Sequence, residues 1–223
     1  MTILAGVSVL LLFSCSNPFA ERTSESIGKD SVILSDTLKQ VDSIAGWSQI
    51  DFEKLGIIAK MAYADTANFM HEKIYPCAKC FLRPEAAAAL IKAADIAKKQ
   101  NLRLVIYDCY RPRVYQQKMY DIVQNPDYVA APGNGSKHNR GLAVDIALAD
   151  ASGVLLDFGC AFDDFSEKAH YTYQGISEQA KSNRKKLRDI MVEAGFEPYK
   201  NEWWHFNYST VSYPSDDFLW NCN

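Results

Sequence analysis

The stretch SKHNRGLAVDIAL, residues 136–148, combines candidate metal ligands with a strand-forming pattern. Residues 142–148 are apolar and partly alternating, which predicts a β-strand. His138 and Asp145 are separated by an odd number of residues, and on one ideal strand such side chains point to opposite faces. They can converge only if the backbone bends between them, and Gly141 is a residue at which a bend is tolerated.

Asp145 is predicted to be buried because Val144 precedes it and Ile146 follows it. A buried carboxylate is costly unless a positive group pairs with it. A bound metal ion would supply that charge. Arg111 and Arg140 are the alternative partners.

A second polar cluster is EWWH, residues 202–205. Glu202 and His205 are also an odd distance apart, so one arrangement has His205 as a metal ligand and Glu202 reaching a water on the metal. Together with the first histidine and aspartate, this makes two imidazoles and one carboxylate, a common zinc ligand set with a fourth position open. The alternative is that the histidines are ordinary core or surface residues and that Trp203 and Trp204 are core aromatics.

The remaining sequence predicts a mixture of helices and strands. Apolar residues at helical spacing, framed by Pro at the start or Gly after the end, predict helices, and short apolar or alternating runs predict strands. The predicted helices are 84–99, 113–123 and 176–194, and the predicted strands are 102–107, 142–148, 154–156 and 202–208. Since helices and strands do not alternate regularly, we expect an α+β fold with a central antiparallel sheet covered by helices.

Composition fits one globular domain with a substantial core. Of 223 residues, 48% are hydrophobic and 23% are charged. The formal net charge is −3 and the charges are interspersed, so no basic surplus indicates nucleic acid or an anionic membrane surface as a partner.

The N-terminus predicts export. Residues 3–13 are apolar apart from Ser8, too short a run to span a bilayer but the length of the hydrophobic region of a secretory signal. It ends in Leu-Phe-Ser-Cys, with Cys15 last, which resembles a bacterial lipobox; a plain signal peptide or a buried segment are the alternatives. Residues 16–45 are polar and predict a tether, so the folded domain is expected at 46–223.

Six cysteines are present: Cys15, Cys77, Cys80, Cys109, Cys160 and Cys222. If Cys15 carries a lipid, an odd number remains and they cannot all pair within the chain. Cys77 and Cys80 form a CxxC, but no second CxxC accompanies it, so a zinc ribbon is not expected. We expect a local structural role or a disulfide to another segment.

The ordered motifs resemble those of the zinc D-alanyl-D-alanine dipeptidases. The pattern Ser-x-His-x-x-Gly-x-Ala-x-Asp at 136–145 is followed by Glu-x-Trp-His at 202–205, and the likeness continues in DCYRP at 108–112, Phe-Asp at 162–163 and NRKKLR at 183–188. It covers roughly residues 55–210. The resemblance implies a Hedgehog/D,D-peptidase-like fold.

The resemblance also implies roles for individual residues. His138, Asp145 and His205 match the ligands of one zinc ion per chain, and Glu202 matches the general base. Arg111 matches an arginine that steadies the oxyanion of the tetrahedral intermediate, a role suited to a fixed guanidinium in a dry site.

For the substrate, Asp163 matches an acid that receives the free amine of a dipeptide, with Asp164 as a second candidate. Ser136 matches a hydroxyl near the substrate carboxylate, and Tyr63 a tyrosine at the amine end. Lys137 departs from the family, which has a small residue there.

The expected function is therefore zinc-dependent hydrolysis of D-alanyl-D-alanine, or a related D,D-dipeptide, in the cell envelope. Two alternatives stay open. One is a D,D- or L,D-carboxypeptidase that acts on peptidoglycan stem peptides, and the other is a non-catalytic protein that binds cell-wall peptides.

Overall fold

The computed structural model describes residues 45–126, 128–131, 133 and 135–222. The predicted signal peptide and lipobox at residues 1–15 lie outside this range, as does the predicted tether up to residue 44. In the part of the chain that is described, no helix combines the length and apolar character needed to cross a bilayer.

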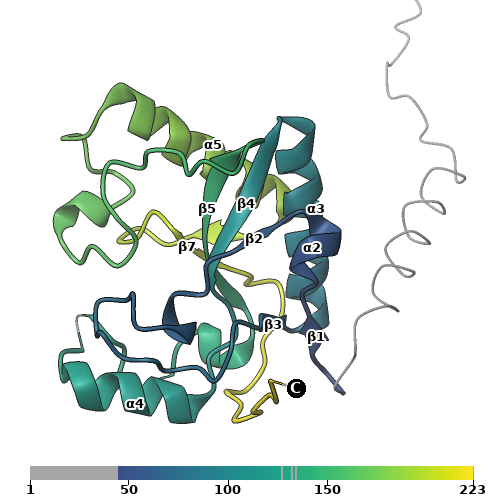
Figure 1. Ribbon diagram of the computed structural model, residues 1–223, viewed down its shortest axis with the longest axis vertical. Coiled ribbons are helices and arrows are strands. Elements are labelled where there is room, and N and C mark those ends of the chain that lie inside the picture. Colours follow the sequence, from purple (N-terminus) through teal and green to yellow (C-terminus); the bar gives the residue numbers. More distant parts are fainter. Residues whose placement is uncertain (1–44, 127, 132, 134, 223) are drawn as a thin grey trace, which may run out of the picture.

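A five-stranded sheet forms the centre of the molecule (Figure 1). Its strands, in spatial order, are β2 (Ile58–Ala59), β4 (Leu102–Asp108), β5 (Ala143–Asp150), β7 (His205–Asn207) and β6 (Glu197–Pro198). The pairs from β4 to β6 are antiparallel, as predicted, whereas β2 lies parallel to β4 at one edge. A second, two-stranded sheet pairs β1 (Ser48–Gln49) with β3 (Phe81–Leu82).

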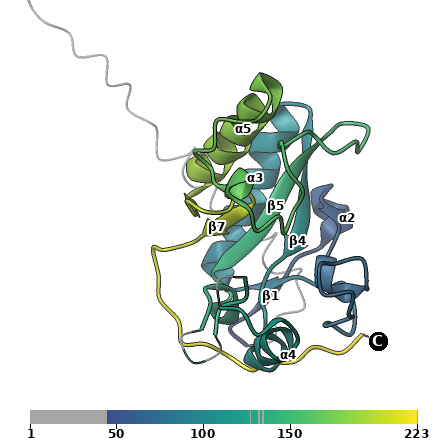
Figure 2. The same cartoon turned by 90° about the vertical axis from the view of Figure 1, so that its left-hand side faces the viewer.

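Two long helices cover one face of this sheet (Figure 2). They are α3 (Pro84–Lys99), which contacts β4, and α5 (Glu178–Ala194), which contacts β5; the two also pack against each other. Helix α4 (Arg113–Val123) lies at the opposite end of the sheet from α5, and α2 (Phe52–Leu55) is a single turn. The mixed α+β architecture predicted from the sequence is confirmed.

Local signals set the helix ends. Pro84 occupies the first turn of α3, where its missing N–H costs nothing. Helix α5 begins at Glu178, two residues later than predicted, because Ser177 caps it by accepting a hydrogen bond from the Ala180 N–H. It ends where Gly195 adopts a left-handed conformation, φ 109°.

Two predicted strands are shorter in the structure. The predicted strand at 154–156 is reduced to one bridge between Ala149 and Leu155, after a turn at Gly153. The predicted strand at 202–208 is reduced to β7, because the residues before His205 form a turn.

Two disulfides tie together distant segments. Cys80 pairs with Cys109, 29 residues away, and Cys77 pairs with Cys222, 145 residues away. Both cysteines of the CxxC thus bond to another segment, as predicted, and Cys160 is the cysteine left free among the described residues. Chain entropy alone assigns about 3–4 kcal/mol to the shorter loop and about 5 kcal/mol to the longer one, so the bridge to the C-terminal segment is expected to contribute more to stability.

Candidate metal centre

Three candidate metal ligands meet on one face of the sheet. Asp145 of β5 lies directly opposite His205 of β7 in antiparallel register, so the two side chains share a face. His138 joins them from the short 3-10 helix η2 (His138–Arg140) that precedes β5. The atoms His138 Nε2 and His205 Nδ1 are 3.2 Å apart, and they lie 3.4 and 3.0 Å from Asp145 Oδ1.

The predicted bend at Gly141 is present. Gly141 adopts a left-handed conformation, φ 69°, and ends η2. A Cβ at this position would lie 2.3 Å from the Trp47 ring, so a glycine is required both for conformation and for space. His138 thus lies in the 3-10 turn before β5 rather than on the strand itself.

The spacing of the three ligand atoms fits zinc. In a tetrahedral site with metal–ligand bonds of about 2.0–2.1 Å, neighbouring ligand atoms lie roughly 3.3 Å apart. The observed separations of 3.2, 3.4 and 3.0 Å are close to that value. Two nitrogens and one oxygen also match the donor preference of this metal.

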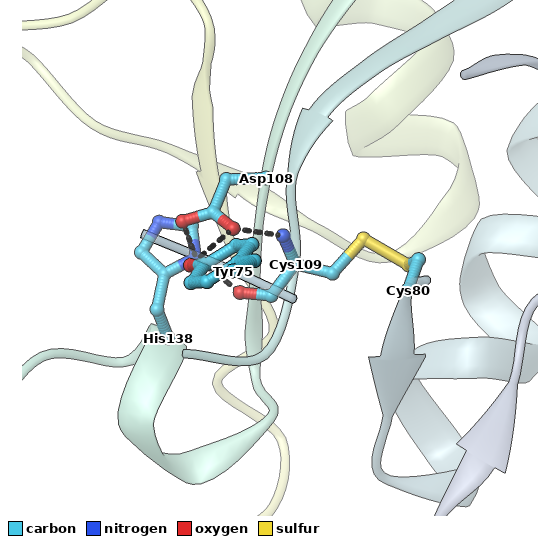
Figure 3. Close-up of a disulfide and its surroundings, with 5 residues drawn as sticks. All are labelled: Tyr75, Cys80, Asp108, Cys109 and His138. Atoms are coloured by element: carbon cyan, nitrogen blue, oxygen red, sulfur yellow. Dashed lines mark hydrogen bonds and ion pairs between the residues drawn. A yellow bond between two sulfur atoms is a disulfide. The ribbon is translucent and has the colours of Figure 1, made fainter. Parts of the chain in front are cut away.

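Hydrogen bonds to the outer ring nitrogens orient both histidines. His138 Nδ1 lies 2.6 Å from the Cys109 carbonyl oxygen (Figure 3), and since a carbonyl only accepts, this nitrogen carries the proton. His205 Nε2 lies 3.0 Å from Asn207 Oδ1 and donates to it. Each imidazole therefore presents its unprotonated nitrogen to the cluster, an arrangement typical of zinc ligands.

The charges of the cluster favour a positive group among the three ligand atoms. Burial by itself would raise the pKa of Asp145, but the charges and hydrogen bonds of His138 and His205 outweigh it and hold this pKa well below its usual range. Burial also opposes the protonation of His205, yet Asp145 raises the pKa of His205 to about 9. The site thus attracts a cation, as expected for a metal centre.

Glu202 lies beside the ligand cluster but outside it. It belongs to the turn before β7, and its Oε2 is 3.7 Å from His205 Nδ1. Burial raises the pKa of Glu202 above its ordinary value, and the charge of His205 only partly offsets this. A carboxylate in this setting is suited to accept a proton.

Arg111 is buried and rigidly held. Its Nε and Nη2 donate to Asp108 Oδ2 at 3.1 and 2.7 Å, and its Nη1 donates to Gln116 at 3.0 Å. Burial opposes the charge, but Asp108 outweighs it and raises the pKa of Arg111 further. A guanidinium has five N–H donors, so two remain for a ligand in the cavity that Arg111 lines.

Asp163 and Tyr63 form a second polar group at the cavity. The Tyr63 hydroxyl lies 3.1 and 3.3 Å from the two oxygens of Asp163 and donates to this carboxylate. Asp163 has a positive φ of 59°, which is uncommon for a residue other than glycine. Burial, together with the charge of Asp145, raises the pKa of Asp163 well above its usual value. The neighbouring Asp164 instead accepts a hydrogen bond from the Ser166 N–H.

Ser136 lies at the start of the turn that carries the first ligand. Its Oγ accepts a hydrogen bond from the His138 N–H, and its own N–H donates to Asn139. Lys137 also lines the cavity, so the residue that departs from the family pattern borders the site.

All eight residues singled out from the sequence border one cavity of about 370 Å³. They are Tyr63, Arg111, Ser136, His138, Asp145, Asp163, Glu202 and His205. Their positions span almost the whole described chain, so the fold alone brings them together.

Asp108, the first residue of the DCYRP motif, is a site residue whose role was not predicted from the sequence. An irregularity in the β4–β5 ladder places Asp108 opposite Asp145, and its carboxylate accepts hydrogen bonds from Tyr75, Arg111 and the Cys109 N–H. The sequence did carry a signal for this role: Asp108 follows an apolar strand and lies three residues before Arg111. Three aromatic side chains at the cavity, Phe69, Tyr128 and Phe165, were also missed; Phe165 packs against the other two.

The sequence is similar to those of known D-alanyl-D-alanine dipeptidases. Residues 54–220 match the Peptidase M15 family model, described as D-ala-D-ala dipeptidase. The chain is 36% identical to the D-alanyl-D-alanine dipeptidase of Escherichia coli (strain K12), over 81% of this chain and 91% of that protein. It is 29% identical to the enzyme of the same name from Enterococcus faecium, over 78% of this chain and 96% of that protein.

Among solved structures, the LdcB LD-carboxypeptidase is 27% identical with a TM-score of 0.39, and the match covers 57% of this chain and 59% of that one. VanYB in complex with D-alanine-D-alanine is 20% identical with a TM-score of 0.39, over 58% of this chain and 72% of that one. On the sequence matches, over most of its described length, the chain belongs to the Peptidase M15 family of D-Ala-D-Ala dipeptidases.

Proposed function

We propose that this protein is a zinc-dependent dipeptidase that hydrolyses D-alanyl-D-alanine. His138, Asp145 and His205 hold one zinc ion per chain. The observation that carries the proposal is the convergence of three ligand atoms within 3.4 Å of one another, each imidazole already oriented by a hydrogen bond.

The chemistry requires water to attack the peptide carbonyl. Zinc, when bound, lowers the pKa of water to about 7 and polarises a carbonyl. Glu202 accepts the proton of the attacking water and returns it to the leaving amine. Arg111 directs its free N–H donors at the oxygen on which negative charge develops, and the ion pair with Asp108 fixes its orientation beforehand.

Asp163 provides the preference for a dipeptide. Its buried carboxylate borders the same cavity as the zinc ligands, where a substrate ammonium group would compensate its charge. A longer peptide has no free amine at that distance from its scissile bond. Tyr63 holds Asp163 in place through its hydroxyl.

Replacing Asp163 by Asn should lower kcat/KM for D-alanyl-D-alanine by about 10- to 100-fold, because a charged hydrogen bond contributes roughly 1.5–3 kcal/mol. The rate for N-acetyl-D-alanyl-D-alanine, which has no ammonium group, should not fall. Steady-state kinetics on both substrates measures this. Asp164→Asn is the matched control and should resemble the wild type. Equal losses of kcat/KM on both substrates would show that Asp163 does not bind the substrate amine. A wild-type enzyme that prefers stem peptides to the dipeptide would indicate a carboxypeptidase.

Zinc affinity should depend on pH. Since Asp145 raises the pKa of His205 to about 9, zinc must displace a proton at any lower pH. We expect the apparent affinity to rise about tenfold per pH unit from pH 6 towards 9 and then to level off. Competition with a chromogenic chelator of known pH dependence, combined with proton-release calorimetry, would measure it. An affinity independent of pH would contradict the assigned ligand set.

We also propose that the protein is exported to the cell envelope and anchored there by a lipid on Cys15. Its two disulfides support export, because such bonds persist in oxidising compartments. Labelling of cells with a radioactive fatty acid would test the anchor: a Cys15→Ala variant should lose the label.

A further inference from the structure

One cysteine of the Cys80–Cys109 disulfide takes part directly in the hydrogen bonds that organise the metal centre (Figure 3). Cys109 provides the carbonyl oxygen that accepts from His138 Nδ1 at 2.6 Å. That bond selects the ring nitrogen that faces the zinc ligands. The backbone position of Cys109 therefore determines how His138 is presented.

The preceding residue, Asp108, orients Arg111. Asp108 is fully buried, and its Oδ2 accepts two of the three hydrogen bonds that orient Arg111 while lying 3.7 Å from His138 Nδ1. Its Oδ1 accepts from the Tyr75 hydroxyl at 2.8 Å. Two consecutive residues thus hold a zinc ligand and the proposed oxyanion partner.

The segment that carries these two residues lies at the end of a strand. Strand β4 ends at Asp108, so Cys109 is beyond the ladder with β5. Cys80, in contrast, is well anchored: its carbonyl accepts from the Ile50 N–H at 2.9 Å, and strand β3 begins at the next residue. The buried disulfide ties Cys109 to this anchored residue. A hydrogen bond from the Tyr110 N–H to the Phe81 carbonyl also links the two segments.

We propose that the Cys80–Cys109 disulfide is a positioning element of the zinc site. It fixes the Asp108–Cys109 segment so that the carbonyl holds His138 and the carboxylate holds Arg111. This inference rests on the proposed zinc dipeptidase function. It goes beyond stability, because it assigns the disulfide an effect on metal affinity and on kcat.

The second disulfide offers a matched control. Cys77 is three residues from Cys80, but its partner Cys222 belongs to the C-terminal segment, and neither residue lines the cavity or bonds to a ligand. Its loop is also longer, so its removal releases more chain entropy in the unfolded state. If both disulfides only stabilise the fold, losing Cys77–Cys222 should reduce zinc affinity and kcat more than losing Cys80–Cys109. If Cys80–Cys109 positions the site, its loss should reduce them more.

The test compares C80A/C109A with C77A/C222A and the wild type. Zinc affinity is measured by competition with a chelator. The constants kcat and KM are measured on D-alanyl-D-alanine at saturating zinc, and folding is checked by thermal unfolding. We expect C80A/C109A to bind zinc about 10- to 100-fold more weakly, the usual effect of losing support for a metal ligand. Its kcat should fall and its KM should change little. C77A/C222A should keep both zinc affinity and kcat within about twofold, even if it unfolds at a lower temperature.

Three results would overturn the proposal: unchanged zinc affinity in folded C80A/C109A, an equal loss of affinity in C77A/C222A, or an equal change in kcat and KM in both. Should C80A/C109A not fold, the single variant C80A replaces it, since this removes the bond and the Cys80 sulfur but keeps the Cys109 side chain as a thiol. If neither folds while C77A/C222A does, the disulfide serves global folding and the proposal fails. A wild type without zinc binding or hydrolysis would instead refute the proposed function.

Discussion

Removal of zinc should reduce hydrolysis of D-alanyl-D-alanine to background, and added zinc should restore it. The metal contributes several kcal/mol of charge stabilisation to the transition state, and each 1.36 kcal/mol is a factor of ten in rate, so the loss should exceed roughly a thousandfold. The three ligand atoms lie within 3.4 Å of one another, and without the metal nothing else described at the site can activate water as strongly.

The measurement is a D-alanine release assay on protein dialysed against a chelator, with metal content determined in parallel. Protein treated with the same chelator already saturated with zinc is the control and should keep its activity. A His205→Ala variant should bind zinc weakly and resemble the stripped enzyme. Full activity in protein shown to be free of metal would refute the mechanism.

The Glu202→Gln variant should lose about 10²- to 10⁴-fold in kcat, the usual contribution of a general base, and should still bind one zinc per chain. Glutamine keeps the shape of the side chain but cannot accept the proton. Because Glu202 lies outside the three-atom ligand cluster, its loss should leave metal affinity nearly unchanged. Kinetics and metal analysis on the same preparation separate the two effects.

The pH profile gives a further readout of Glu202. Burial raises its pKa, and the ionised form is the active base, so activity is present above the raised pKa and is lost as the pH falls through it. This acidic limb should disappear in Glu202→Gln. Glu197→Gln, at an exposed position on β6, is the control and should keep it. A Glu202→Gln enzyme within tenfold of the wild type would show that another group takes the proton.

Much of the fold follows from local sequence. The helices at 84–99 and 113–123 were predicted with the observed bounds, because proline and apolar spacing act over a few residues. The bend at Gly141 followed from the odd separation of His138 and Asp145. Strands β2 and β6 were not predicted, since two residues each carry no periodicity and only their neighbours in the sheet define them.

The site was predicted less completely than the fold. The eight residues named from the sequence share one cavity, but the resemblance to a known family chose several of them, including Arg111 and Asp163. Glu202 was expected in a strand because its aromatic neighbours favour strands. It lies in a turn, since tertiary contacts determine the backbone conformation there. The role of Cys109 depends on His138, 29 residues away in sequence, which no local pattern reveals.

The position of β7 in the sheet has a consequence for how the protein is made. A ribosome that has delivered β5 has already produced His138 and Asp145, but the third ligand is 60 residues beyond Asp145, on strand β7, which must pair with β5. Contacts so distant in sequence form late in folding. Zinc capture is therefore expected only after His205 has been translated, and a product terminated before this residue would lack one of the three ligands.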